Sequence, residues 1–217
     1  MVVICGIDEA GRGPVIGPMV IAGVLLDEKD IKKLRKIGVK DSKLLSRERR
    51  EALFEMVKRI VNAYEFIIVS PREIDMAVES KQMNLNLLEA HKTAEIINKL
   101  KPDKAIVDSP SVNHKSYSDY LKRLIVNKDI KLECTHKADV RYPHVAAASI
   151  IAKVIRDREI DNMKEKYGDC GPGYMSNPIT KDFLERNWKK YPEIFRHSWI
   201  SYKNQKNKTF QRNLSDF

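Results

Sequence analysis

The chain has 217 residues, enough for one domain with a sizeable core and a short appendage. Apolar residues make up 42% of it, yet no apolar run reaches the roughly 18 residues that a membrane span needs. The first residues lack the basic start and small-residue cleavage site of a signal peptide. These features argue against membrane and secreted proteins, and we expect a cytoplasmic one.

Charge is the strongest signal of the composition, with a net charge of +10 and a pI of about 9.4. A polyanionic partner is the natural interpretation, nucleic acid before membrane, because no strongly basic amphipathic helix stands out. A lysine-rich solvated surface is the alternative. Cys5, Cys134 and Cys170 are odd in number and have no CxxC spacing, which favours a reducing compartment over a disulfide framework.

Apolar runs and helix-period patterns alternate along the chain, and together they predict a mixed α/β sheet with helices packed on it. The apolar runs predict strands over 2–7, 19–26, 65–70, 104–107 and 131–136. The periodic patterns predict helices over 46–63, with Ser46 as N-cap, over 84–100, from about Asp139 onward, and over 180–190. We expect a main domain over 1–170, a helical part of the same unit over 171–202, and a flexible tail over 203–217.

Three acidic positions come at the ends of predicted strands, where ligands gather in such sheets. Asp8 and Glu9 follow the first strand, Asp108 follows the fourth, and Asp139 comes just after the fifth. Carboxylates crowded at one edge repel one another unless a cation neutralises them, and Mg²⁺ prefers such oxygen ligands. Two ions about 4 Å apart can promote phosphodiester hydrolysis by water.

Two other interpretations of these residues are weaker. A single Asp or Glu after a strand is often a turn or capping residue, but only one of two neighbouring side chains can reach a given cap. The glycines of "GRGPVIG" suggest a dinucleotide-binding loop, but GxGxxG spacing requires glycine where Ile16 stands, and an apolar run follows in place of a helix.

Six blocks of the sequence together resemble ribonuclease HII, the type 2 ribonuclease H, in its archaeal form. They occur in the family's order, and the resemblance runs from residue 2 to about 200. The blocks are "GIDEAGRGPVIGPMV" at 6–20, "DSK" at 41–43, "VDSP" at 107–110, "HKAD" at 136–139, "AAASIIAKVIRDR" at 146–158 and "GPGY" at 171–174. The related ribonuclease HIII has an additional N-terminal domain and a lysine in the glycine motif, where this chain has Arg12.

The resemblance implies an RNase H-like fold and a metal-dependent endonuclease that yields 5′-phosphomonoesters. The implied substrates are the RNA strand of RNA–DNA hybrids and duplex DNA with single embedded ribonucleotides, nicked on the 5′ side, as in ribonucleotide excision repair and DNA replication. The family's four acids, which hold two Mg²⁺ or Mn²⁺ ions and are catalytic, fall on Asp8, Glu9, Asp108 and Asp139.

The resemblance also implies substrate-binding residues. Gly11, Arg12 and Gly13 match the motif that contacts the ribonucleotide backbone and its 2′-hydroxyl, and glycines suit such a close approach. Tyr174 matches the tyrosine that stacks under the next sugar, and Lys43 matches a phosphate-binding lysine. The family often has proline after this tyrosine, where this chain has Met175.

Two points remain open at this stage. A basic nucleic-acid-binding protein with structural metal is the competing function, and metal-dependent strand scission distinguishes the two. At the C-terminus, Gln211, Leu214 and Phe217 fit Q-x-x-L-x-x-F, which resembles the peptide that docks on the replication sliding clamp, without its usual second aromatic. A tight helical turn would place Leu214 and Phe217 on one side.

Overall fold

The computed structural model describes residues 2–39 and 45–215, with side chains up to residue 208. The chain divides into two compact units, each built from segments distant in sequence. The first unit comprises Met1–Ala10, Val20–Ile68 and Asn86–Ile155, and the second comprises Gly11–Met19, Val69–Leu85 and Arg156–Phe217. Residues 11–18, which connect β1 to β2, belong to the second unit together with C-terminal segments. The domain boundaries expected from the sequence stay a prediction.

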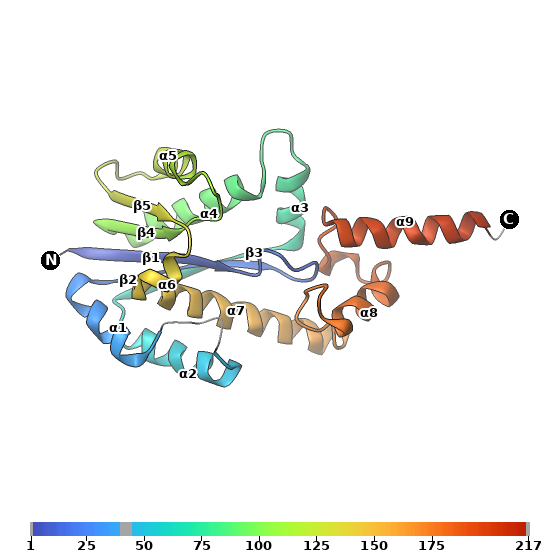
Figure 1. The fold of residues 1–217 in the computed structure, drawn as a ribbon, viewed down its shortest axis with the longest axis horizontal. Coiled ribbons are helices and arrows are strands. Elements are labelled where there is room, and N and C mark those ends of the chain that lie inside the picture. The colour runs from blue at the N-terminus through green and yellow to red at the C-terminus, as the bar shows by residue number, and fades with distance from the viewer. Residues whose placement is uncertain (1, 40–44, 216–217) are drawn as a thin grey trace. The chain divides into compact units, whose positions relative to one another are not determined.

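The first unit is built on one five-stranded sheet with the order β3-β2-β1-β4-β5 (Figure 1). The strands are β1 (Val3–Ala10), β2 (Met19–Asp27), β3 (Ala63–Val69), β4 (Lys104–Asp108) and β5 (Lys131–Thr135). β1 pairs with β2 antiparallel and with β4 parallel, and β4 pairs with β5 parallel. The mixed sheet and its five strands confirm the predicted fold class.

Helices cover both faces of this sheet (Figure 1). They are α1 (Ile31–Ile37), α2 (Arg47–Lys58), α4 (Leu85–Leu100), α5 (His114–Leu124), α6 (Ala138–Arg141) and α7 (Pro143–Tyr167), with a 3-10 turn at Glu28–Asp30. A core cluster joins residues of β1 and β2 to α1, α2 and the alanine-rich start of α7. On the other face a Cβ at Gly23 of β2 would lie 2.5 Å from Ile96 of α4.

The alanine-rich helix lies unusually close to the central strand. A Cβ added at Gly6 of β1 would lie 2.4 Å from the carbonyl carbon of His144, at the start of α7. Ala146, Ala147 and Ala148 are all buried there. The absence of a side chain at Gly6 and the small residues of α7 therefore bring the helix backbone against the strand that carries Asp8.

The second unit holds α3 (Pro71–Glu79), α8 (Pro178–Asn187), α9 (Ile200–Ser215) and a 3-10 turn at Pro192–Ile194. Its core gathers Val15, Ile16, Phe183, Phe195 and Tyr202 with further buried side chains. No helix in the described part of the chain is long and apolar enough to cross a membrane.

The elements agree with the sequence patterns in most places. Ser46 caps α2, since its side chain accepts a hydrogen bond from the backbone N–H of Arg49, as predicted. The predicted helix from Asp139 is two helices, and β1 extends to Ala10, so that Asp8 and Glu9 lie within the strand and not after it. Residues 203–215, expected to be tail, continue α9, because no glycine or proline interrupts this polar run.

Candidate active site and metal centre

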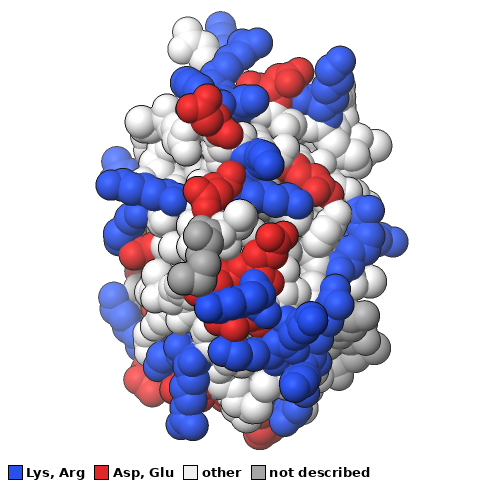
Figure 2. Space-filling model, turned by 90° about the vertical axis from the view of Figure 1, so that its left-hand side faces the viewer, with Lys and Arg blue, Asp and Glu red and all other residues white. Residues whose placement is uncertain are grey.

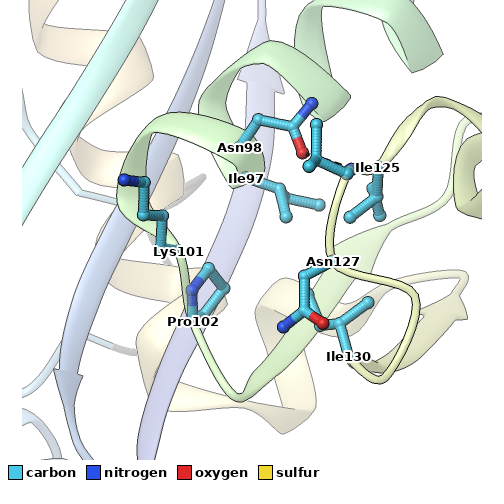
Figure 3. Close-up of a pocket in the computed structure, with 8 residues that line it drawn as sticks. Ile97, Asn98, Lys101, Pro102, Ile125, Asn127 and Ile130 are labelled. Atoms are coloured by element: carbon cyan, nitrogen blue, oxygen red, sulfur yellow. Dashed lines mark hydrogen bonds between the residues drawn. The ribbon is translucent and has the colours of Figure 1, made fainter.

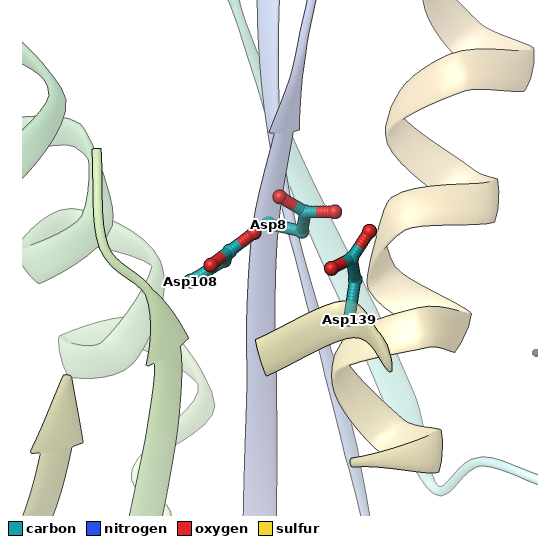
Figure 4. Close-up of side chains that lie close together, drawn as sticks. All are labelled: Asp8, Asp108 and Asp139. Atoms are coloured by element: carbon teal, nitrogen blue, oxygen red, sulfur yellow. The ribbon is translucent and has the colours of Figure 1, made fainter. Parts of the chain in front are cut away.

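Strand pairing brings the first two aspartates together. Pairing between β1 and β4 reaches Ile7 opposite Val107, one residue before Asp8 and Asp108 respectively. The two carboxylates therefore come from neighbouring parallel strands at the same level of the sheet (Figure 4). Asp8 is 5% exposed and Asp108 is half-buried.

The third aspartate comes from the short helix α6, and Asp108 helps to place that helix. The chain leaves β5 through Lys137, which adopts a left-handed conformation with a φ of 56°, and then enters α6. Asp108 Oδ1 accepts a hydrogen bond of 3.1 Å from the backbone N–H of Ala138, the first residue of the helix. Asp139 follows in the same turn and its carboxylate points toward the other two (Figure 4).

Asp8, Asp108 and Asp139 form the aspartate cluster. Each offers a carboxylate oxygen, and these three oxygens lie within 4.8 Å of one another. Burial first, and then the charges of Glu9 and Asp108, raise the pKa of Asp8 well above its usual value, against the opposing influence of Ser149 and Lys153. A hard divalent cation fits this arrangement, because it takes carboxylate oxygens and cancels their repulsion.

Two residues of α7 hold Asp8 from the helix side. The Ser149 hydroxyl hydrogen-bonds the Asp8 carboxylate, and Lys153 Nζ donates to Ser149 Oγ at 2.8 Å. Ser149 is fully buried, and the two residues are one helical turn apart. The main chain of the next residue contributes too, since Asp8 Oδ1 accepts from the backbone N–H of Glu9 at 2.8 Å. Neither Ser149 nor Lys153 carries a local sequence signal for this role.

Glu9 occupies a different position from the three aspartates. Side chains alternate along a strand, so Asp8 faces α7 while Glu9 faces α4. Glu9 lines a cavity of about 10 Å³, the space of a single water molecule, together with Glu89 and Thr93 of α4. Asp8 and Asp108 line the same cavity, so Glu9 lies near the cluster. Within the described residues, Glu9 is not a member of the group whose oxygens lie within 4.8 Å. The three aspartates lie together as the strand ends suggested, with Glu9 next to Asp8 in the chain. The roles of all four acids in binding metal stay predictions.

The glycine motif lies in the second unit, in an irregular loop that we call the glycine loop, residues 11–17. Gly11 has a φ of +80°, and a Cβ there would lie 2.2 Å from Arg156 Nε, so the position admits no side chain. Arg156 also lies over the ring of Tyr174, with its guanidinium carbon 5.3 Å from the ring centre. A Cβ at Gly13 would lie 3.9 Å from Tyr174 Cε1. The glycine loop and Tyr174, both predicted substrate contacts, are therefore neighbours.

The remaining predicted residues are only partly described. Lys43 and Phe217 lie outside the residues that the structure describes. Gln211 and Leu214 belong to α9 by their backbone, and their side chains are not described. The predicted contacts of these four residues stay predictions.

Two further features lie apart from the cluster. An apolar pocket of about 390 Å³ is lined by residues such as Ile97, Pro102, Ile125 and Ile130, near the amino end of β4 and so at the opposite end of that strand from Asp108 (Figure 3).

On the face drawn in Figure 2, Lys and Arg side chains are spread widely and intermixed with acidic ones.

Comparison with known proteins agrees with this geometry. The family model described as Ribonuclease HII matches residues 5–202. Ribonuclease HII from Pyrococcus furiosus is 47% identical over 199 residues, covering 89% of this chain and 87% of the relative. The chain belongs to the ribonuclease HII family. The crystal structure of the ribonuclease H2 from Pyrococcus horikoshii superposes with a TM-score of 0.87 at 44% identity, covering 95% of this chain and 98% of the other.

A second solved relative is the ribonuclease HII in the PCNA:RNase HII complex from Archaeoglobus fulgidus. It has a TM-score of 0.83 at 45% identity, and the match covers 91% of this chain and 95% of the other. As a member of the ribonuclease HII family, the chain is an RNase H-type endonuclease with an RNase H-like fold. Membership also implies dependence on divalent metal ions, which the aspartate cluster is suited to bind.

Proposed function

We propose that this ribonuclease HII cleaves the RNA strand of RNA–DNA hybrids and nicks duplex DNA on the 5′ side of single embedded ribonucleotides. The aspartate cluster carries the proposal, because three carboxylates held within 4.8 Å suit a phosphodiester-cleaving metal centre. Divalent Mg²⁺ or Mn²⁺ ions, two in the active complex, would supply water activation and stabilisation of the leaving oxygen.

The chain's own residues would orient this chemistry. Asp8, Asp108 and Asp139 would hold the ions, with Glu9 as the fourth acid, and Ser149 would keep the Asp8 carboxylate in place through its hydroxyl. Attack by water leaves a 3′-hydroxyl and a 5′-phosphate. Attack by the 2′-hydroxyl would leave a cyclic phosphate, so the ends report the mechanism.

Recognition of the ribonucleotide falls to the second unit in this proposal. Gly11, Arg12 and Gly13 would approach the sugar and its 2′-hydroxyl, and Tyr174 would stack under the next sugar. Their support is the close packing of Gly13, Arg156 and Tyr174. Lys43 would contact a phosphate.

The test is a duplex DNA oligonucleotide with one ribonucleotide, incubated with the protein and Mg²⁺, with the products sized and their ends analysed. We expect a nick directly 5′ of the ribonucleotide with 3′-hydroxyl and 5′-phosphate ends, and no cleavage of the all-DNA duplex. A cyclic phosphate, or undiminished cleavage in EDTA, would overturn the mechanism. Retardation of the duplex without any cleavage would favour the competing function of a nucleic-acid-binding protein.

We further propose that Gln211, Leu214 and Phe217 dock on the replication sliding clamp. The similarity to a ribonuclease HII solved in complex with PCNA supports this, as does the Q-x-x-L-x-x-F spacing at the end of a polar helix. A segment this short buries little surface, so we expect modest affinity. Titration of the organism's own clamp should show binding by the full chain and by Lys206→Ala, and loss of binding by a chain ending at Thr209 that still cleaves a short oligonucleotide. Equal affinity of all three proteins would discard the motif.

A further inference from the structure

The glycine loop is an irregular segment in which one side chain donates to the main-chain carbonyls of Gly11, Arg12 and Gly17. Arg196 Nη2 donates to the Gly11 carbonyl at 2.5 Å, and its Nη1 donates to the Arg12 carbonyl at 2.7 Å. Nε and Nη2 donate to the Gly17 carbonyl at 3.1 and 3.0 Å. One guanidinium therefore holds both ends of the loop.

An arginine is suited to this task in a way that lysine is not. Arg196 is fully buried, and its planar group presents donors at fixed angles in three directions. A lysine has a single nitrogen, which cannot replace the hydrogen bonds that Nε, Nη1 and Nη2 of Arg196 make together to three carbonyls. Removing the guanidinium would leave carbonyls without these donors and free the loop to change conformation.

The structure holds Arg196 itself in place. Its guanidinium carbon lies 5.0 Å from the ring centre of Trp199, and the indole N–H of Trp199 donates to the Gly13 carbonyl at 3.0 Å. The backbone N–H of Arg196 donates to the Val15 carbonyl at 2.9 Å. Asp75 of α3 accepts from the backbone N–H groups of His197 and Ser198 at 2.8 and 2.9 Å, which fixes the turn between Arg196 and α9.

The other side of the glycine loop rests on the segment that carries Tyr174. The backbone N–H groups of Val15 and Ile16 both donate to the Gly173 carbonyl, at 2.9 and 3.4 Å. Arg156 Nη2 donates to the Pro172 carbonyl at 2.9 Å while its guanidinium lies over Tyr174. The position of the loop backbone is thus fixed relative to Tyr174.

We propose that Arg196, supported by Trp199, is a positioning residue that fixes the glycine loop in the conformation that recognises the ribonucleotide. Arg196 acts through the loop, since its donors are directed at the Gly11, Arg12 and Gly17 carbonyls, and it therefore sets selectivity for ribose without taking part in the cleavage step. This inference rests on the proposed role of residues 11–13 in substrate recognition.

The experiment compares Arg196→Lys, Trp199→Phe and the control Arg186→Lys, whose side chain is exposed on α8. Each protein receives the duplex with one ribonucleotide as substrate and the all-DNA duplex as competitive inhibitor, at a temperature below unfolding. We expect Arg196→Lys to raise KM for the ribonucleotide duplex about tenfold, because it loses at least one charge-assisted hydrogen bond to the loop. Ki for the DNA duplex and the half-saturating Mg²⁺ concentration should stay as in wild type. Trp199→Phe keeps the ring and loses the Gly13 hydrogen bond, so its KM should rise less and in the same direction.

Several results would overturn the inference. A lower kcat with unchanged KM in Arg196→Lys indicates a smaller folded fraction, which is a purely structural role. If Arg196→Lys does not fold, Trp199→Phe decides, and an unchanged KM in that variant refutes the inference. Failure of the proposed function is distinguishable, because wild type itself would then show equal affinity for the two duplexes or no cleavage.

Discussion

The two compact units position their proposed functional groups in different ways. In the first unit, adjacent parallel strands bring Asp8 and Asp108 to one level, and repulsion between carboxylates remains for a cation to cancel. In the second unit, an irregular loop gains its shape from Arg196, which is 185 residues from Gly11 in the sequence. Regular strand pairing therefore positions the proposed metal centre, whereas side-chain donors distant in the sequence position the proposed recognition loop.

The largest loss of cleavage activity should come from substitutions in the aspartate cluster of the first unit. Asp8→Asn and Asp108→Asn each remove a charge of the proposed metal centre, so we expect cleavage to fall by about 100-fold or more. Binding of the ribonucleotide duplex should persist, because the basic surface and glycine loop are intact. Single-turnover cleavage and an equilibrium binding assay measure the two effects, with the exposed Asp129→Asn as control. Wild-type cleavage by either variant would remove that aspartate from the active site.

The next effect should come from Tyr174 in the second unit. Tyr174→Phe keeps the ring over which Arg156 lies and loses only the hydroxyl, whereas Tyr174→Ala loses both. Stacking is worth about 1–3 kcal/mol per base contact, so Ala should reduce kcat/KM by roughly tenfold or more and Phe by less. Steady-state kinetics on the ribonucleotide duplex compare the two variants. If neither variant changes kcat/KM measurably, Tyr174 has no role in substrate binding and is an ordinary surface aromatic.

A smaller effect should come from the helix that supports Asp8. Ser149→Ala removes the hydroxyl that bonds the Asp8 carboxylate and accepts from Lys153. Groups that orient a metal ligand affect metal affinity by about 10–100-fold, and we expect the low end, a roughly tenfold rise in the half-saturating Mg²⁺ concentration. A Mg²⁺ titration of cleavage measures it, with the exposed Ser116→Ala for comparison. The account of Asp8 positioning is wrong if the two variants titrate alike.

The smallest effect concerns stability without metal. Burial raises the pKa of Asp8, so the folded protein binds this proton more tightly than the unfolded chain does. The free energy of unfolding therefore falls as pH rises from about 3.9, the usual Asp pKa, through the raised pKa. At pH 7 the ionised Asp8 carboxylate destabilises the folded state.

Asp8→Asn removes this destabilising charge. In EDTA at pH 7 its melting temperature should exceed that of wild type by about 2–4 °C, equivalent to roughly 1 kcal/mol for a chain of this size. The difference should vanish below the pKa of the unfolded carboxyl. Thermal unfolding followed by circular dichroism measures the difference. A lower melting temperature for the variant at pH 7 would contradict the destabilising effect of the buried Asp8 charge.

The sequence was sufficient to predict the sheet and the aspartates, since apolar runs mark the strands and their carboxyl ends carry Asp8 and Asp108. The sequence did not show how Glu9 would be placed, because side chains of adjacent strand residues alternate, and its role in binding metal stays a prediction. The helix α3 was missed although Ser70 and Glu73 form a capping box around Pro71. Arg196 had no local signal, because one arginine among 40 basic residues reveals its role only when folding brings it to Gly11.

The most direct test of the division between cleavage and recognition measures duplex affinity in two variants. Asp8→Asn alters the aspartate cluster, and Gly11→Ala places a Cβ 2.2 Å from Arg156 Nε at a φ of +80°, which must distort the glycine loop. The measured quantity is the ratio of the dissociation constants for the all-DNA duplex and the single-ribonucleotide duplex. We expect Asp8→Asn to keep the wild-type ratio and Gly11→Ala to bring it close to one. Loss of the preference in Asp8→Asn with its retention in Gly11→Ala would contradict the account.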